Sequence, residues 1–165
     1  MKMRDMTLHL DRGKLKFSAG HFTIFSKTER ETLHGHNYTL SVLVTAEQIA
    51  PGITFDYRLL TQKLSGLCQL LHLKFLVPMQ SPFLEISEDN QHVEIIFNHE
   101  SMWLLKKDIV MMPIENISLE DLSQWFIDRI TQDQLFLSEH KIKKIVITVY
   151  NGPHHGAEAM YERKI

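Results

Sequence analysis

The sequence has few of the features that mark secreted, membrane or nucleic-acid-binding proteins. Its 165 residues include one cysteine, Cys68, so no intramolecular disulfide can form. No apolar run approaches the ~20 residues that a membrane-spanning helix needs. The formal net charge of -2 gives no electrostatic reason to expect nucleic acid or an anionic membrane as a partner. The opening residues MKMRDMTLHLDRGK lack the apolar core of a signal peptide. We therefore expect a cytoplasmic protein.

The composition that is present is typical of one globular domain. Hydrophobic residues make up 44% of the chain and charged residues 23%. There is no internal repeat, low-complexity tract or block of like charge, and we expect a single domain over residues 1–165. Cys68 lies in the apolar segment LSGLCQLLHL and is interpreted as a buried helix residue.

Two patterns predict strands in the first third of the chain. Arg12-Gly13 is interpreted as a turn between Thr7–Leu10 and Lys14–Ile24, which we expect to pair antiparallel. The segment Asn37–Thr45 alternates with period two, which is typical of a strand. Its predicted apolar face consists of Tyr38, Leu40, Val42 and Val44.

Two segments have helical spacing. Apolar residues from Tyr57 to about Leu71 fall on one helical face. A second helix is expected after Ser118, which can cap it, with Asp121 in capping-box position.

A strand pair is predicted between the two helices, and a last strand after them. His92–Phe97 and Met102–Asp108 are expected to pair through a turn at Asn98-His99-Glu100, and Lys143–Tyr150 forms the last strand before a short extended tail. Because strands pair locally and helices lie between them, the fold class is α+β.

Three histidines are placed to meet. His34 and His36 flank Gly35 at the entry to a strand, and residues i and i+2 of a strand point to the same face. A hairpin loop over Ser26–Thr32 would bring His21 beside them. Three imidazoles suit Zn²⁺ and leave one position open, as in catalytic sites. The same ligands could serve other metals, and the alternative is three unrelated histidines.

At these residues the sequence resembles the 6-pyruvoyl-tetrahydropterin synthase / 6-carboxytetrahydropterin synthase family. The matching segments are FSAGH (Phe17–His21), LHGHNY (Leu33–Tyr38), GITFDY (Gly52–Tyr57) and ISLEDL (Ile117–Leu122). The resemblance implies a tunnelling-fold (T-fold) subunit of order β-β-α-α-β-β, with the extra strand pair as an insertion between the helices. It also implies zinc on the three histidines, and a hexamer of two trimers with active sites at subunit interfaces.

The resemblance also implies a reaction. Family enzymes act on 7,8-dihydroneopterin triphosphate, whose side-chain hydroxyls bind zinc, and the common branch uses a cysteine before the HGH motif as base. Here Glu31 stands three residues before His34, similar to the branch with ExxHGH spacing that cleaves the side chain to 6-hydroxymethyl-7,8-dihydropterin. A carboxylate near a metal-bound hydroxyl can act as a general base. The alternative is a solvated loop glutamate.

The sequence departs from the family at an Asp-His pair that follows the first helix. If His72 takes the place of the histidine, Leu71 replaces the aspartate; in the other register His72 replaces the aspartate and Leu73 the histidine. Either way the pair is incomplete, and His72 lacks the carboxylate that would orient it. His72 is retained as a candidate second proton carrier.

A second departure concerns the pterin pocket. The family places a glutamate after the last strand, where it binds the pterin edge, and this chain has Asn151, followed by His154 and His155, which are interpreted as solvated. Losing that carboxylate could cost a few kcal/mol, at ~1.5–3 kcal/mol for each hydrogen bond to a charged group. Glu120 matches a pterin-pocket glutamate but also suits a helix first turn. Asp56 is interpreted as structural.

The leading hypothesis is a zinc-dependent lyase-type enzyme acting on a dihydropterin or a close heterocycle. Two alternatives stay open. One is a catalytically weakened or divergent member that binds zinc and another heterocycle or serves as a binding protein. The other is an interaction domain without metal.

Overall fold

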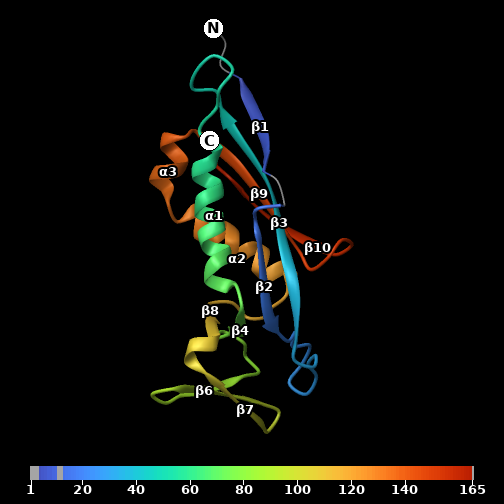
Figure 1. Cartoon of the computed structure of the whole chain (residues 1–165). Helices are drawn as coiled ribbons and strands as arrows, with labels where there is room; N and C mark the ends of the chain where they lie inside the picture. The colour runs from blue at the N-terminus through green and yellow to red at the C-terminus, as the bar shows by residue number, and fades with distance from the viewer. Residues whose placement is uncertain (1–3, 11–12, 165) are drawn as a thin grey trace.

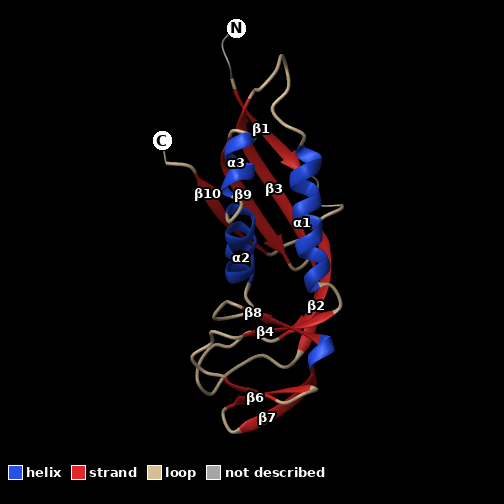
Figure 2. Cartoon of the chain, turned by 90° about the vertical axis from the view of Figure 1, so that its left-hand side faces the viewer, coloured by secondary structure: helices blue, strands red, loops and turns tan. Residues whose placement is uncertain are grey.

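Three helices cover one face of a seven-stranded mixed sheet (Figures 1 and 2). This computed structural model describes residues 4–10 and 13–164. The strands of the main sheet are β1 (Asp5–Leu10), β2 (Lys16–His21), β3 (His34–Glu47), β4 (Lys74–Pro78), β8 (Ile109–Met112), β9 (Ile142–Tyr150) and β10 (Gly156–Glu162). They are ordered β10-β9-β3-β2-β4-β8, and β1 also pairs with β3. The mixture of strands and helices confirms the α+β class.

The long strand β3 runs through the middle of the sheet (Figure 1). It contains the predicted segment Asn37–Thr45, and the four residues predicted to face the core are buried. Strand β9 pairs with β3 only from Thr39 onward, whereas β2 pairs with His34–Thr39 on the other edge. In the described part of the chain, the first residues of β3, His34–Tyr38, are therefore paired along one edge alone.

The predicted pairing of Thr7–Leu10 with Lys14–Ile24 is wrong. Both β1 and β2 pair antiparallel with β3 instead, β1 at Val42–Glu47 and β2 at His34–Thr39. They follow one another along the same edge of β3, since β9 occupies the opposite edge. A glycine between two extended segments allows them to pair with each other or to pair one after the other with a third strand. The second arrangement forms here because the long strand β3, which follows later in the chain, offers an edge to both. Arg12 of the predicted turn lies outside the described residues.

The predicted helices are present as α1 (Tyr57–Leu71) and α2 (Leu119–Thr131), and a short α3 (Gln134–Glu139) follows. Cys68 is buried on the inner face of α1, as predicted. The Ser118 side chain accepts the Asp121 N–H at the start of α2. The Asp121 carboxylate accepts from the N–H of Asn116, so the reciprocal bond to the cap residue is replaced by one to the preceding loop.

The helices pack on the inner face of β2 and β3 through aromatic contacts. The Phe17 ring stacks on Tyr38 with 4.9 Å between centroids and lies 6.0 Å from the Phe126 ring of α2. All three side chains are nearly inaccessible to solvent. This cluster fixes α2 against the part of the sheet that carries the three histidines.

The segment between α1 and α2 holds more structure than the predicted strand pair. That pair is present as β6 (His92–Phe97) and β7 (Glu100–Leu105), followed by a 3-10 turn over Lys106–Asp108. Strand β5 (Glu85–Glu88) joins them in a separate three-stranded sheet, called the insertion sheet below. Strands β4 and β8, which flank it in the chain, extend the main sheet by parallel pairing. The insertion sheet lies at the same end of the molecule as the loop after β2 (Figure 1).

The last strand and the tail behave as expected. Strand β9 contains Lys143–Tyr150, and the extended tail pairs with it antiparallel as β10. Among the described residues, none of the helices has the length and apolar character required to cross a bilayer.

Candidate metal centre and catalytic site

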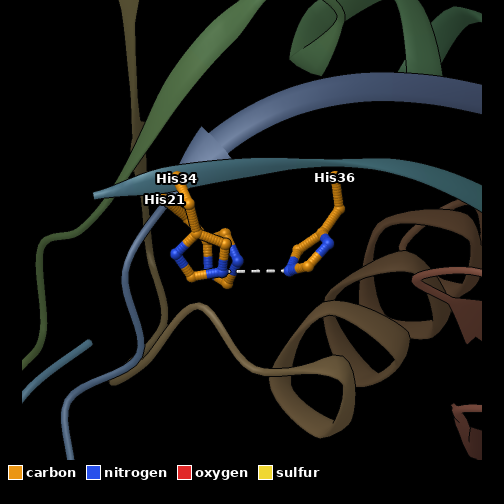
Figure 3. Close-up of side chains that lie close together, drawn as sticks. All are labelled: His21, His34 and His36. Carbon is orange, nitrogen blue, oxygen red and sulfur yellow. Dashed lines mark hydrogen bonds between the residues drawn. The ribbon is translucent and has the colours of Figure 1, made fainter. Parts of the chain in front are cut away.

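The three predicted ligands come together at the end of β2 and the beginning of β3. His21 pairs directly with His34 across the two strands, and His36 lies two residues further along β3. Figure 3 shows all three rings on the same side of the strands, facing the segment that leads into α2. One ring nitrogen of each histidine lies within 4.8 Å of the corresponding nitrogens of the other two. The spacing argument for HGH on a strand is thus consistent with the structure.

Backbone carbonyls hold two of these rings in a definite orientation. His21 Nδ1 lies 3.0 Å from the Ile117 carbonyl oxygen, and His34 Nδ1 lies 2.6 Å from the Thr32 carbonyl oxygen. Because a carbonyl can only accept, each Nδ1 carries the proton and each Nε2 presents a lone pair. Hydrogen bonds of this kind, made by the ring nitrogen away from the metal, orient ligating histidines in metal sites.

The three Nε2 nitrogens suit a cation. His21 Nε2 is buried and has no hydrogen-bond partner among the described residues, and leaving such an atom unsatisfied costs about 1–3 kcal/mol. His34 Nε2 and His36 Nε2 are 3.0 Å apart. Two ligands bound tetrahedrally at ~2.0–2.1 Å would be about 3.3 Å apart. The donor set and the unpaired buried nitrogen therefore suit a metal ion such as Zn²⁺.

Burial favours the neutral, metal-binding form of His21 and His36. Desolvation, followed by the neighbouring His34 and His36, lowers the pKa of His21 to about 4, and desolvation lowers the pKa of His36. Both rings are therefore deprotonated at pH 7 and need lose no proton to bind a cation. Tyr38 packs edge-on against His21 and His36, and its own burial raises the pKa of its hydroxyl.

Gly35 sits between the two β3 histidines for a steric reason. A Cβ at this position would lie 3.1 Å from the carbonyl oxygen of Ala19 on β2. A larger residue would push β2 away from β3 and change the distance from His21 to its partners. The glycine thus permits the close backbone approach that was expected from the sequence.

Glu31 lies beside Nε2 of His34, the ring nitrogen available to a metal ion. Its Oε2 is 3.7 Å from His34 Nε2 and accepts the Thr23 N–H at 2.9 Å. Its own N–H donates to the Thr23 carbonyl at 2.9 Å. Burial raises the pKa of Glu31, but the Thr23 hydrogen bond and the histidines outweigh it and the net shift is downward. The carboxylate is therefore ionised near neutral pH, which suits a proton acceptor.

His72 lies apart from the histidine cluster. Its Nδ1 accepts the N–H of Ser18 on β2 at 3.1 Å, just after the end of α1. No hydrogen bond, ion pair or ring contact joins it to the three histidines within the described part of the chain. Leu71 is fully buried in the core and Leu73 is 75% exposed with a φ of 59°. Neither supplies a carboxylate to His72.

The two candidate pterin-binding residues lie at the ends of two elements, Asn151 after β9 and Glu120 at the start of α2. Asn151 follows directly on β9, whose last residue pairs with Thr39 of β3. Its Oδ1 is buried without a hydrogen-bond partner in the described residues. Glu120 is exposed in the first turn of α2, three residues after Ile117, which binds His21. Asp56 caps α1 and forms an ion pair with Arg58, consistent with a structural role.

Sequence reasoning did not find the groups that hold this site in place. The carbonyls of Thr32 and Ile117 and the N–H of Thr23 are main-chain groups, which any residue type would supply. The Arg30 side chain donates to the Glu31 carbonyl at 2.8 Å, and nothing in the sequence distinguishes this arginine from an ordinary charged loop residue. Its position between phenylalanines at 22 and 97 depends on a tertiary contact that sequence spacing does not reveal.

Fold and site together define a class of protein: an α+β fold whose sheet carries, beside a carboxylate, three histidines that could hold a metal ion. The family model described as "6-pyruvoyl tetrahydropterin synthase" matches residues 12–162. The chain belongs to this family of pterin synthases, and its fold is the T-fold. The family predicted from the four sequence motifs is thus confirmed.

Relatives and solved structures agree with this assignment. A Pyrococcus horikoshii protein provisionally named 6-carboxy-5,6,7,8-tetrahydropterin synthase is 24% identical over 147 residues, which cover 88% of this chain and 86% of that one. The structure of 6-pyruvoyl tetrahydropterin synthase from Plasmodium vivax superposes with a TM-score of 0.90 at 28% identity, covering 97% of this chain and 99% of that one.

A mutant structure of the same enzyme identifies a catalytic residue type. In this Plasmodium vivax variant, a glutamate described as a catalytic residue is replaced by cysteine. It matches with a TM-score of 0.88 at 26% identity, over 99% of this chain and all of that chain.

Proposed function

We propose that the protein is a zinc-dependent lyase-type enzyme that acts on a dihydropterin such as 7,8-dihydroneopterin triphosphate. The observation that carries the proposal is the position of Glu31, an ionised carboxylate 3.7 Å from the nitrogen that His34 turns toward the candidate metal centre. His21, His34 and His36 would hold the zinc ion. When bound, zinc would polarise the oxygens of the substrate side chain.

Glu31 would be the proton acceptor in this reaction. Its carboxylate is fixed by the Thr23 N–H and is 35% exposed, so it is both oriented and accessible to a bound molecule. The related Plasmodium vivax enzyme also has a catalytic glutamate. Together with the ExxHGH spacing, this relative supports the same role for Glu31 here.

The other site residues would bind or assist. Asn151 has a buried amide oxygen free to accept a hydrogen bond from a heterocycle, and Glu120 lies on the helix that approaches the cluster. Among the described residues, His72 has no contact with the three histidines of its own chain. It would therefore be a second proton carrier only if it lay beside the active site of a neighbouring subunit. A homo-oligomer, formed as a hexamer of two trimers in the cytoplasm, is part of this proposal.

The test combines metal analysis with turnover. We expect one zinc per chain and conversion of 7,8-dihydroneopterin triphosphate, followed by chromatography of the pterin product. Glu31→Gln should retain zinc but lower kcat by about 10²–10⁴-fold, the usual contribution of a general base. Glu29→Gln is the matched control, because Glu29 is an exposed carboxylate of the same loop, and it should keep wild-type kcat. Bound zinc without turnover of any dihydropterin would refute the proposed activity.

The second candidate is a divergent family member that binds zinc and a different heterocycle. The observation that favours it is Asn151, whose amide can accept and donate but carries no charge, where a carboxylate would bind a pterin edge more strongly. Fluorescence titration with a pterin distinguishes the two. Tight pterin binding that is lost in Asn151→Ala supports the enzyme, and absence of binding supports the divergent member.

A further inference from the structure

Arg30 links the insertion sheet to the loop that carries Glu31. The loop after β2 turns back on itself through a bridge between Ile24 and Arg30. This places the Arg30 side chain beside Phe22, which directly follows the candidate ligand His21. The same side chain reaches the insertion sheet at Phe97, the last residue of β6.

The guanidinium lies over two aromatic rings. Its central carbon is 4.7 Å from the centroid of Phe22 and 5.7 Å from that of Phe97. Both rings are buried in a small apolar cluster that joins the loop to the insertion sheet. A cation over aromatic faces is attracted by their negative potential, more strongly where water is excluded. With 21% of its side chain exposed, Arg30 is largely desolvated.

The same guanidinium fixes the main chain of Glu31. Arg30 Nη1 donates to the Glu31 carbonyl at 2.8 Å, while the Glu31 N–H and carboxylate are bound by Thr23. The residue is therefore held from three sides, and Arg30 connects its carbonyl to the insertion sheet. The ion pair from Arg30 to Glu100 is long, at 4.0 Å, and Glu100 is 78% exposed, so it adds little.

We propose that Arg30 is a positioning residue through which the insertion sheet sets the location of the Glu31 carboxylate. This inference rests on the proposed role of Glu31 as proton acceptor. A base must lie within hydrogen-bond reach of the proton that it removes. A displacement of about 1 Å can cost about 100-fold in rate. The insertion sheet thus contributes to the site without supplying a residue that touches substrate.

The main variant is Arg30→Met, because methionine keeps an apolar stem between the two rings but cannot donate to the Glu31 carbonyl. We expect zinc content to stay at the wild-type value, kcat to fall by about 10–100-fold and KM to change less than about twofold. Hydrogen exchange of the Thr23 amide, resolved by fragmentation mass spectrometry, should become faster, because this amide is bound by the Glu31 carboxylate. A purely structural Arg30 would leave the Thr23 amide unchanged.

Phe97→Leu tests the connection to the insertion sheet independently. It should lower kcat and speed Thr23 exchange, both to a smaller extent than Arg30→Met does. Added to Arg30→Met, it should change either measurement little further, because both substitutions break the same connection. Trp103→Leu is the matched control: Trp103 is an aromatic of the same sheet, on β7, 57% exposed and in ring contact with His92. It should leave both measurements at wild-type values.

Two results would overturn the inference. One is an Arg30→Met protein that binds zinc and keeps wild-type Thr23 exchange. The other is full additivity of Arg30→Met and Phe97→Leu, which would show that the two side chains act separately. If Glu31→Gln keeps full activity, the proposed function fails instead, and Thr23 exchange still reports whether Arg30 positions Glu31.

Discussion

At the scale of the residue, His21 couples the protonation of the cluster to folding. The ring is buried and its pKa is lowered to about 4, whereas an unfolded histidine titrates near pH 6.5. Between these values the unfolded chain binds the extra proton, so the free energy of unfolding falls as the pH is lowered from 6.5 to 4. For metal-free protein the loss from His21 is about 3 kcal/mol.

Urea unfolding of the metal-free protein between pH 4 and pH 7 measures this loss. His21→Gln should reduce the slope of stability against pH, while His99→Gln, at an exposed turn of the insertion sheet, should leave it unchanged. Equal slopes in wild type and His21→Gln would contradict the lowered pKa of His21 as the source of this pH dependence.

If the proposed function holds, Asn151 is the residue at which we expect a substitution to alter ligand preference. Among the described residues its buried amide oxygen has no hydrogen-bond partner, and a carboxylate there could accept two charge-assisted hydrogen bonds from a pterin edge. Asn151→Glu should tighten pterin binding roughly tenfold, equivalent to about 1.4 kcal/mol. It should also lower the melting temperature of the ligand-free protein, because a buried charge without a partner is costly. Fluorescence titration and thermal unfolding report the two effects, and unchanged affinity would place the heterocycle elsewhere.

At the scale of the element, substitution of two glycines by alanine should change the stability of the protein in opposite directions. Gly66 is exposed within α1, and a Cβ there would meet nothing within 4 Å. Gly66→Ala should raise the free energy of unfolding by about 0.5–1 kcal/mol, since glycine costs a helix that much. A Cβ on Gly156 of β10 would lie 2.6 Å from the Tyr150 ring. Gly156→Ala should therefore destabilise the protein. Thermal unfolding separates the two, and a stabilising Gly156→Ala would contradict the observed β9–β10 packing.

The elements that could be predicted from sequence are those with a long and regular period. Strand β3 alternates over many residues and α1 keeps one apolar face for four turns. The predicted bounds of α1 match, and the predicted strand Asn37–Thr45 lies within the longer β3. Strands β4 and β8 are short, with five and four residues, and a buried run of that length has no diagnostic period. The pairing of β1 with β3 depends on which later strand offers a free edge, which local patterns do not encode.

The candidate site was predictable to the extent that side chains define it. The HGH spacing, His21 on a neighbouring strand and Glu31 three residues before His34 all indicated their positions correctly. The main-chain carbonyls that orient the rings have no sequence signature. The contact of Arg30 with Phe97 joins residues 67 positions apart and follows only from the folded insertion.

At the scale of the whole molecule, a bound metal would join separate parts of the fold. His21 lies on β2, His34 and His36 lie on β3, and His21 is tied to the loop before α2 through Ile117. A metal present at 100 times its dissociation constant contributes about 2.7 kcal/mol, so chelation should lower the melting temperature by roughly 5–10 °C. The His36→Ala variant should lose much less on chelation. An unchanged melting temperature after complete metal removal would argue against these ligands.

The half-paired start of β3 has a further consequence for how this chain can diverge. From His34 to Tyr38 one edge of the strand has no neighbouring strand among the described residues, because the last residue of β9 pairs with Thr39. The N–H and C=O groups along this edge can form hydrogen bonds to a ligand or to a strand of another copy. Nearly every residue type supplies these main-chain groups, so they remain when the side chains change. Under the proposed function, side chains such as Asn151 would set which heterocycle is preferred, while the main-chain groups at this edge of β3 stay the same.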